Sequence, residues 1–241
     1  MTDSIREQIC TAFKTRLQKI LTSNQYNSDM GSNVMRSHLP PVDGSLAPAI
    51  GFHLDDEENL QAYEQSEQKE LPIRVQGVSK KISPNTYAET TELLYADICE
   101  CVLCEEWSVG YDSGGTTEIE AGDTIIDETT GATGLVESLT LDSGSWAGGD
   151  AAGTFTLRRV TGFFQNNSDL QVGVDTGLAT VDGTPTGTGA LELTTNNLCE
   201  AITFSTGNIK TPESDGNAVG VQIVIRVIYR SIAGNPYSQT I

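Results

Sequence analysis

The alternation of hydrophobic and polar positions predicts a leading helix. Apolar residues recur at helical spacing after Ser4, which predicts a helix over residues 4–21. Ser4 followed three residues later by Glu7 forms a capping box, a signature of a helix N-terminus. The apolar stripe consists of Ile5, Ile9, Phe13, Leu17 and Ile20.

A second helix is expected to open at Ser83-Pro84 and to end near Glu105. Proline is pre-organised for the first turn of a helix, because its backbone angle is already helical. The apolar positions again recur at helical spacing. They are Tyr87, Leu94, Ile98, Cys101 and Val102.

Period-two alternation predicts strands over residues 33–36, 49–54 and 71–79. In the second of these, Ile50, Phe52 and Leu54 alternate with smaller or polar residues, which is typical of a half-buried strand. The acidic stretch 55–70 is too long for a tight turn. We expect it to be an exposed loop at the strand tip, with room for a short helical turn.

The last segment, GVQIVIRVIYRSIAGNPYSQTI, begins as the clearest strand of the chain and continues as a polar tail. One strand face is apolar, whereas the other is mixed, so both faces are expected to be at least partly covered, by helices or by a neighbouring subunit. The apolar face carries Val221, Ile223, Ile225 and Val227, and the mixed face Gln222, Val224, Arg226 and Ile228. The tail is either dispensable or held by another molecule.

The composition changes between residues 107 and 196. Gly, Thr, Asp and Ser predominate, and Arg158 and Arg159 are the only basic residues. Short alternating runs separated by turn residues indicate a small all-β module, Ig-like or a small β-sandwich. Disorder is the alternative for such a composition, and aromatic residues such as Trp146 and Phe155 favour the folded module.

These elements predict an α+β fold with an antiparallel sheet flanked by two helices. Residues 1–105 and 197–241 would form this discontinuous domain, and residues 106–196 would be an inserted sandwich-like β domain. Insertion is tolerated where the two chain ends lie close together at the surface.

The charge pattern argues against nucleic-acid and membrane partners. The formal net charge is −19, and the fourteen Lys and Arg residues are scattered rather than gathered in a basic stripe. No apolar stretch is long enough to span a membrane. The simplest interpretation of the acidity is that copies of the chain repel one another and stay soluble.

No catalytic, cofactor or metal site is expected. His38 and His53 have no cysteine or carboxylate at ligand spacing. The CECVLC motif at 99–104 could contribute to a zinc site with Cys199, but small residues packed in a helix are the simpler interpretation. The acidic run 55–58 lacks the spacing of a calcium loop and is expected to be solvated.

Outside the insert, the chain resembles the tail terminators of tailed bacteriophages. The resemblance rests on IREQICTAFKTRLQKI, PAIGFHLDDEE, ELPIRVQGVSK, ELLYADICECVL and above all the closing IVIRVIYRSIAGNPYSQ. Tail terminators tend to end on such a strand followed by a Gly-(Asn/Asp)-Pro-Tyr tail. The insert resembles β modules found on diverse phage virion proteins.

This resemblance implies a structural virion protein of the tail neck, assembled in the host bacterial cytoplasm, and no enzyme. A hexameric ring would cap the head-proximal end of the tail tube, stop its growth and present a surface to the head–tail connector. The partners would be further copies of the chain, the tail tube protein and the connector, with DNA only passing through the ring. The implied interface residues are Arg226, Tyr229, Arg230, Asn235, Pro236 and Tyr237.

Three other interpretations remain open at this point. The protein could be another virion ring, such as a connector or a tube subunit. It could be a carbohydrate-binding surface module, if aromatic residues of the insert cluster on one exposed face. The candidates for that face are Trp107, Tyr111, Trp146 and Phe164. An enzyme is the least favoured, because no acid–base or nucleophile constellation is visible.

Overall fold

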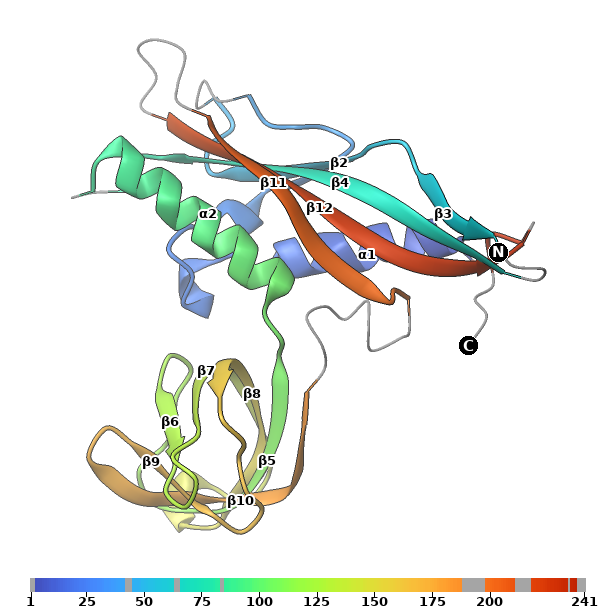
Figure 1. Cartoon of the computed structure of the whole chain (residues 1–241). Helices are drawn as coiled ribbons and strands as arrows, with labels where there is room; N and C mark the ends of the chain where they lie inside the picture. The colour runs from blue at the N-terminus through green and yellow to red at the C-terminus, as the bar shows by residue number, and fades with distance from the viewer. Residues whose placement is uncertain are drawn as a thin grey trace. The chain divides into compact units, whose positions relative to one another are not determined.

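The computed structural model describes residues 3–41, 45–62, 66–82, 85–187, 198–210, 218–233 and 235–237. The chain forms two compact units (Figure 1). The main unit comprises Met1–Leu103 and Leu191–Ile241, and the barrel unit comprises Cys104–Ala190. The boundaries expected from the sequence are 105/106 and 196/197, and the second of these lies outside the described residues.

A six-stranded sheet forms the centre of the main unit. Its strand order is β1-β2-β4-β12-β11, and β3 pairs with the N-terminal part of β4. The pair β1–β2 is parallel, and all other pairs are antiparallel. The strands are β1 (Val34–Arg36), β2 (Ala49–Leu54), β3 (Glu58–Ala62), β4 (Ser66–Lys80), β11 (Ala201–Lys210) and β12 (Ala218–Ile232).

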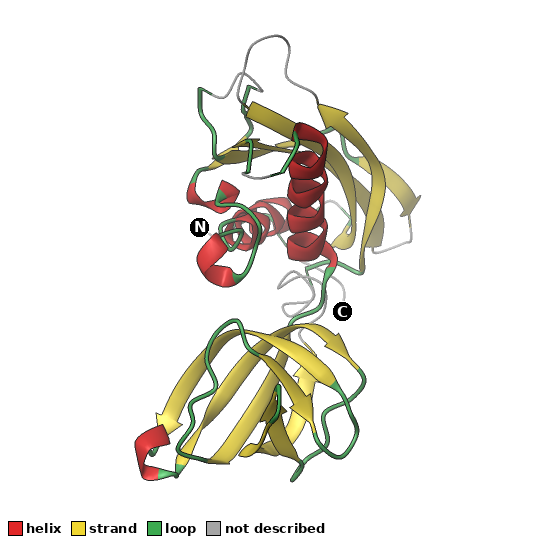
Figure 2. Cartoon of the chain, turned by 90° about the vertical axis from the view of Figure 1, so that its left-hand side faces the viewer, coloured by secondary structure: helices red, strands yellow, loops and turns green. Residues whose placement is uncertain are grey.

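Two helices, α1 (Ile5–Leu17) and α2 (Tyr87–Leu103), cover the same face of this sheet (Figure 2). The short 3₁₀ turns η1 (Thr22–Asn24) and η2 (Met30–Ser32) follow α1. Helix α1 begins as predicted, because the Ser4 hydroxyl accepts a hydrogen bond from the Glu7 amide at 3.2 Å. The predicted apolar stripe and the apolar face of β12 are buried together in one core.

The crossing of the two helices is fixed by a buried arginine. Arg16 of α1 is 1% exposed, and its Nε donates to the Cys101 carbonyl at 2.5 Å. The Cys101 thiol in turn donates to the Arg16 carbonyl at 3.1 Å. Carbonyls in the last turn of a helix have no partner within the helix and favour a nearby positive charge. Arg16 therefore satisfies the C-terminal end of α2 while it packs in the core.

The barrel unit is a closed sheet with the order β10-β5-β8-β7-β6-β9, in which β9 pairs back to β10. Strand β10 closes it, because its first half pairs with β9 and its second half with β5. Bulges interrupt four of the strand pairs, and bulges bend and twist a sheet. The strands are β5 (Trp107–Gly114), β6 (Thr124–Asp127), β7 (Thr133–Ser143), β8 (Ala151–Thr161), β9 (Asp169–Val172) and β10 (Asp175–Gly187), and the turn η3 is Trp146–Gly148.

The predicted fold class is wrong. Strands account for 50% and helices for 19% of the described residues, so the protein is mostly β rather than α+β. The helices do not flank the sheet, because both lie on one face, and the insert is a closed barrel rather than an Ig-like or sandwich domain. The stretch 55–70, expected to be a loop, contains β3 and the first part of β4.

A buried carboxylate organises the turns at one end of the barrel. Asp127 is fully buried and accepts hydrogen bonds from the amides of Thr129 (2.8 Å), Thr130 (2.8 Å) and Gln165 (2.6 Å) and from the Ser168 hydroxyl (2.6 Å). Burial alone would raise the pKa of this carboxyl. The four hydrogen bonds outweigh the burial and hold the pKa of Asp127 below its ordinary value.

The barrel should therefore lose stability in acid through Asp127. Because its folded-state pKa is the lower one, the contribution is full above the unfolded pKa of about 3.9 and is lost as the pH falls through the folded pKa. We expect Asp127→Ala to cost about 2–4 kcal/mol near neutral pH, since several buried donors lose their acceptor. It should also flatten the acid limb of the stability curve.

Urea denaturation followed by tryptophan fluorescence measures this effect in the barrel alone, because Trp107 and Trp146 are the two tryptophans of the chain and both lie in that unit. Asp142→Ala, at an exposed position of β7, is the matched control. An unchanged urea midpoint and acid dependence in Asp127→Ala would contradict the assigned role.

Candidate interaction site

Alternation along β12 sends the predicted interface residues to opposite faces of the main sheet. Tyr229 lies on the face that the helices cover and is 3% exposed. Arg226 and Arg230 lie on the other face, which we call the outer face, and their side chains are 49% and 42% exposed. The expected interface residues thus do not form one continuous cluster.

On the inner side, Tyr229 belongs to a small polar cluster. Its hydroxyl donates to the Glu57 carboxylate, which also binds the Lys69 ammonium at 3.1 Å. Lys69 lies 3.4 Å from Glu67 as well. Burial, together with the hydrogen bond and the charge of Glu57, raises the pKa of Tyr229, so its hydroxyl stays protonated and acts as a donor.

The outer face carries a line of arginine–carboxylate pairs. Arg226 binds Glu70 at 3.2 Å and donates from Nε to the Ser205 hydroxyl at 3.1 Å. Arg230 binds Glu200 at 2.5 Å. Arg226 thus links β12 to β4 and to β11, and Arg230 links β12 to the residue just before β11.

A third pair, Arg74–Asp55 at 3.0 Å, extends the line along β4. Part of the outer face is covered by the segment that follows β1. Gln76 donates to the Pro40 carbonyl at 2.6 Å, and a Cβ at Gly51 would lie 2.1 Å from the His38 carbonyl oxygen. The remaining outer face, around Arg226 and Arg230, is half-exposed in the described chain.

The first residues of the tail fold back onto the main unit. The Asn235 amide donates to the Ile232 carbonyl at 2.8 Å, and the Ile5 amide donates to the Pro236 carbonyl at 2.9 Å. The Tyr237 amide donates to the Asn235 side chain at 3.0 Å, and Tyr237 as a residue is 56% exposed. Asn235 and Pro236 thus lie against the start of α1, whereas Tyr237 points to solvent.

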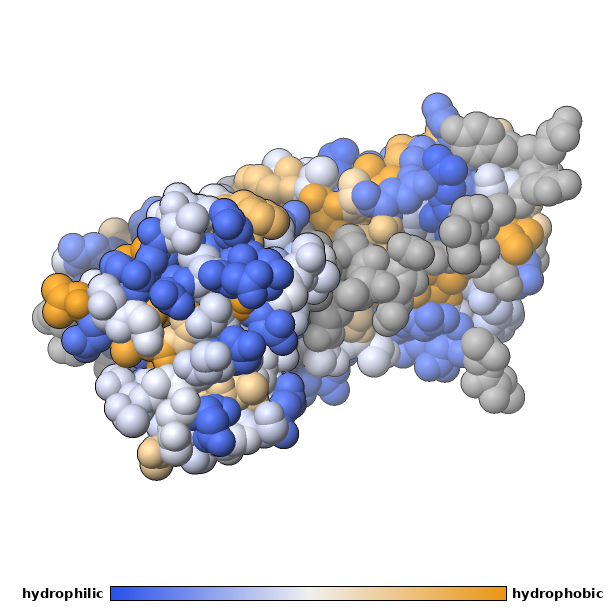
Figure 3. Space-filling view, turned by 90° about the horizontal axis from the view of Figure 1, so that it is seen from below, coloured by the Kyte–Doolittle hydropathy of each residue, from blue (hydrophilic) through white to orange (hydrophobic). Residues whose placement is uncertain are grey.

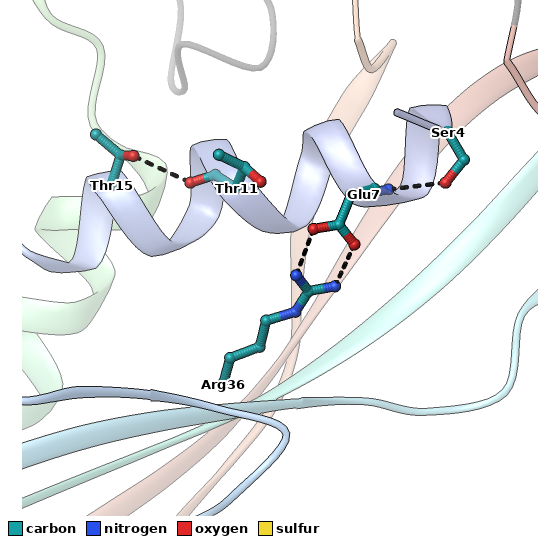
Figure 4. A network of polar contacts seen from close by, with 5 residues as sticks. All are labelled: Ser4, Glu7, Thr11, Thr15 and Arg36. Carbon is teal, nitrogen blue, oxygen red and sulfur yellow. Dashed lines mark hydrogen bonds and ion pairs between the residues drawn. The ribbon is translucent and has the colours of Figure 1, made fainter. Parts of the chain in front are cut away.

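A second contact holds the start of α1 in place. Arg36 of β1 binds both carboxylate oxygens of Glu7, at 2.5 and 2.6 Å (Figure 4). The hydrogen bonds from Arg36 lower the pKa of Glu7. The Ser4 cap lies at the same end of the helix, so α1 is anchored next to the tail.

The residues that surround Tyr229 and Pro236 were not predicted from the sequence as part of a site. Ser4, Arg6, Glu57, Lys69 and Ser231 line a cavity together with those two. Glu57 and Lys69 fall in the stretch predicted to be a loop, so their approach to Tyr229 could not be foreseen. The ladder between β4 and β12 places Lys69 directly opposite Tyr229, and a correct strand assignment for residues 66–70 would have revealed it.

The cysteine motif and the acidic run do not form a metal site with one another or with the histidines in the described residues. Cys101 and Cys199 are buried and Cys99 and Cys104 are half-buried, and none of these four forms a disulfide. Within the described residues, no group of three His, Cys, Asp or Glu side chains could hold a metal ion. In the acidic run 55–58, Asp55 and Glu57 form ion pairs instead of remaining solvated.

Three of the four aromatic residues considered for glycan binding are buried in the barrel core, and only Trp107 is half-buried. Tyr111 stacks on Trp146 at 5.4 Å and on Phe155 at 4.2 Å between ring centroids. The exposed large hydrophobics of the barrel include Leu141, Phe163 and Val174. Figure 3 shows hydrophobic side chains on one face as separate groups among hydrophilic ones. These four aromatic residues therefore do not form the exposed face that glycan binding would require.

Comparison with known protein families finds no matching family, and comparison with curated proteins finds no match. Among the described residues, no helix has the length and apolar character needed to cross a bilayer.

We expect Tyr229→Phe to destabilise the main unit by about 1–3 kcal/mol, because Glu57 loses a buried hydrogen-bond donor. Tyr237→Phe is the matched control. It removes the same hydroxyl from a residue that is 56% exposed and should change stability by less than about 0.5 kcal/mol. Far-ultraviolet circular dichroism follows the denaturation of both units, and tryptophan fluorescence, which reports only the barrel unit, separates the transition of the barrel from that of the main unit. Equal stability of the two variants would show that the Tyr229 hydroxyl does not support this cluster.

Proposed function

We propose that this protein is a structural subunit that assembles with further copies of itself into a ring at the head-proximal end of a phage tail tube. In this proposal the ring stops tube growth and provides the surface that joins the head connector. The observation that carries the proposal is the uncovered part of the outer face, where half-buried apolar side chains lie among paired arginines and carboxylates.

This surface has the character of a protein–protein interface. On this face of β12, Ile228 lies between Arg226 and Arg230 and Val224 lies next to Arg226, and both apolar side chains are only partly buried in the single chain. Interfaces combine apolar centres with arginine and with paired charges, because complementary charges fix the register of the partners. The ion pairs of Arg226 and Arg230 leave these side chains ordered, so little side-chain entropy remains to be lost on association.

The tail supports the same proposal. Asn235 and Pro236 are held beside α1, and Tyr237 presents an exposed ring from this fixed position. Tyrosine is enriched at interfaces because it offers a large apolar area and one polar group. A neighbouring copy, the tail tube protein or the connector is the expected partner for this ring.

The acidic barrel unit suits an outward position in such an assembly. Repulsion between barrel units of adjacent copies would be smallest on the outer wall of a ring, and it would discourage sideways association between rings. A ring of identical subunits uses one heterologous interface repeatedly and closes on itself, which fits a hexamer.

The ring itself can be tested with Ile228→Lys. The variant should fold, because Glu70 lies directly opposite position 228 and accommodates a positive charge. It should fail to assemble, because a lysine is costly at the centre of an interface. Analytical ultracentrifugation and negative-stain microscopy should show closed rings for the wild type and monomers for the variant.

Leu141→Lys, at a position of the barrel that is 48% exposed, is the control and should leave the rings intact. A monomeric wild type across the accessible concentration range would overturn self-assembly.

The position of the ring in the virion requires the phage. A nonsense mutation in the gene should give abnormally long tubes without heads, because nothing stops polymerisation. Tails of normal length that fail to join heads would instead assign the protein to the connector. A deletion of residues 234–241 should give a folded protein that does not cap tubes, and normal capping would exclude a role for the tail.

A further inference from the structure

The main sheet has an open strand at each of its two edges. Within the described part of the chain, β11 pairs with β12 alone. Strand β12 occupies one side of β4 along the whole length of β4. Strands β2 and β3 therefore share the other side of β4, and β3 pairs with β4 alone. Strands β3 and β11 thus lie at opposite edges of the same sheet (Figure 1).

The edge formed by β11 is weakly protected against pairing with another strand. Native edge strands are usually short, charged or interrupted by proline, because their open N–H and C=O groups invite a further strand. The ten residues of β11, AITFSTGNIK, include no proline and one charged residue, at the last position. A bulge between Phe204 and Thr206 is the feature that opposes pairing there.

Each open edge also exposes a large apolar side chain. Phe204 of β11 is 40% exposed, although its ring packs edge-on against Tyr95 of α2 at 6.0 Å between centroids. All five residues of β3 are exposed, and Leu60 among them is 43% exposed. In a chain with a formal net charge of −19, the two edge strands carry one charged residue each. Both edges therefore suit contact with another protein strand better than most of this acidic surface.

The two edges run in directions that allow them to pair. Strands β11 and β4 are both antiparallel to β12, whereas β3 is antiparallel to β4, so β3 runs opposite to β11. Rotation of one copy onto the next around a ring keeps this relation, as it does among the strands of a closed barrel. The β11 edge of one copy then meets the β3 edge of its neighbour as an antiparallel pair. Glu58 opens β3 and Lys210 ends β11, so this arrangement brings opposite formal charges to the same end of the pair.

We propose that the β11 edge binds the β3 edge of a second copy through main-chain hydrogen bonds, so that neighbouring sheets join into one. Two different edges make a heterologous contact, which repeats from copy to copy until a ring closes. The inference rests on the ring of the proposed function and names the surface by which its copies join. Because β11 is the strand next to β12, a copy seated there also lies beside the outer face around Ile228.

Amide hydrogen exchange measured by mass spectrometry tests this pairing. An amide that points away from the sheet exchanges rapidly in a single copy and slowly once a second copy accepts its hydrogen bond. Peptides that contain Ile202–Ser205 and Glu58–Ala62 should exchange about tenfold or more slowly in assembled wild-type protein than in the monomeric Ile228→Lys variant. Strand β6 is the internal control, because it pairs on both sides within the barrel and should exchange equally in the two proteins.

Leu60→Pro blocks the β3 edge directly. Leu60 is the extra residue of a bulge between Asn59 and Gln61, and bulges in edge strands accommodate proline. The variant should therefore keep the circular dichroism spectrum of the wild type, and its self-association should weaken by about tenfold or more, because the proline removes a donor and obstructs the neighbouring strand. Leu60→Ala is the matched control, since it removes the apolar side chain but keeps the N–H group, and it should still form rings.

The outcomes separate this pairing from the ring itself. Rings in which β11 and β3 exchange as fast as in the monomer, or rings that a folded Leu60→Pro variant forms unchanged, would overturn the edge pairing and leave the ring standing. Protection of β11 without β3, together with a dimer in sedimentation, would show that two β11 edges pair and would overturn the assignment to β3. A wild type that stays monomeric would overturn the ring of the proposed function, and the edge pairing with it.

Discussion

The antiparallel pairing of β4 with β12 is the constraint on which the main unit depends. It runs without a break from Ser66 opposite Ile232 to Lys80 opposite Ala218. This pairing joins two parts of the sequence that are separated by the whole barrel unit. It sets the inner face, on which both helices pack, and the outer face, on which the arginines line up. A shift by one residue would exchange the two faces and place the arginines in the core.

The polar features of the candidate site follow from that pairing. Lys69 meets Tyr229 because they are directly opposite in the ladder, and Glu57 reaches both from the segment before β3. The end of β12 then brings the tail to the first turn of α1, where the Pro236 carbonyl satisfies a helix amide. The cavity is thus bounded by segments from the start, the middle and the end of the chain.

The sequence predicted the elements that carry a regular apolar periodicity. Helix α1 with its Ser4 cap, β2 and the two faces of β12 are confirmed, because regular alternation of apolar and polar residues reports burial directly. Strand β3 was missed because all five of its residues are exposed, so it has no apolar periodicity. The barrel was mistaken for a sandwich because closure depends on bulges and on the shared pairing of β10, neither of which changes the hydrophobic pattern. The cavity could not be predicted, since it depends on contacts across the whole main unit.

The same ladder determines the order in which the chain can fold during synthesis. The barrel unit contains all of its own strands, so it can close as soon as Ala190 has emerged. Strand β4 is made earlier but must wait for β12, and until then one long edge of the unfinished sheet has no partner. Unpaired edges invite contacts with other chains. The early-folding acidic barrel adds negative charge to the nascent chain during the wait, and repulsion between such chains would keep them apart until β12 completes the sheet.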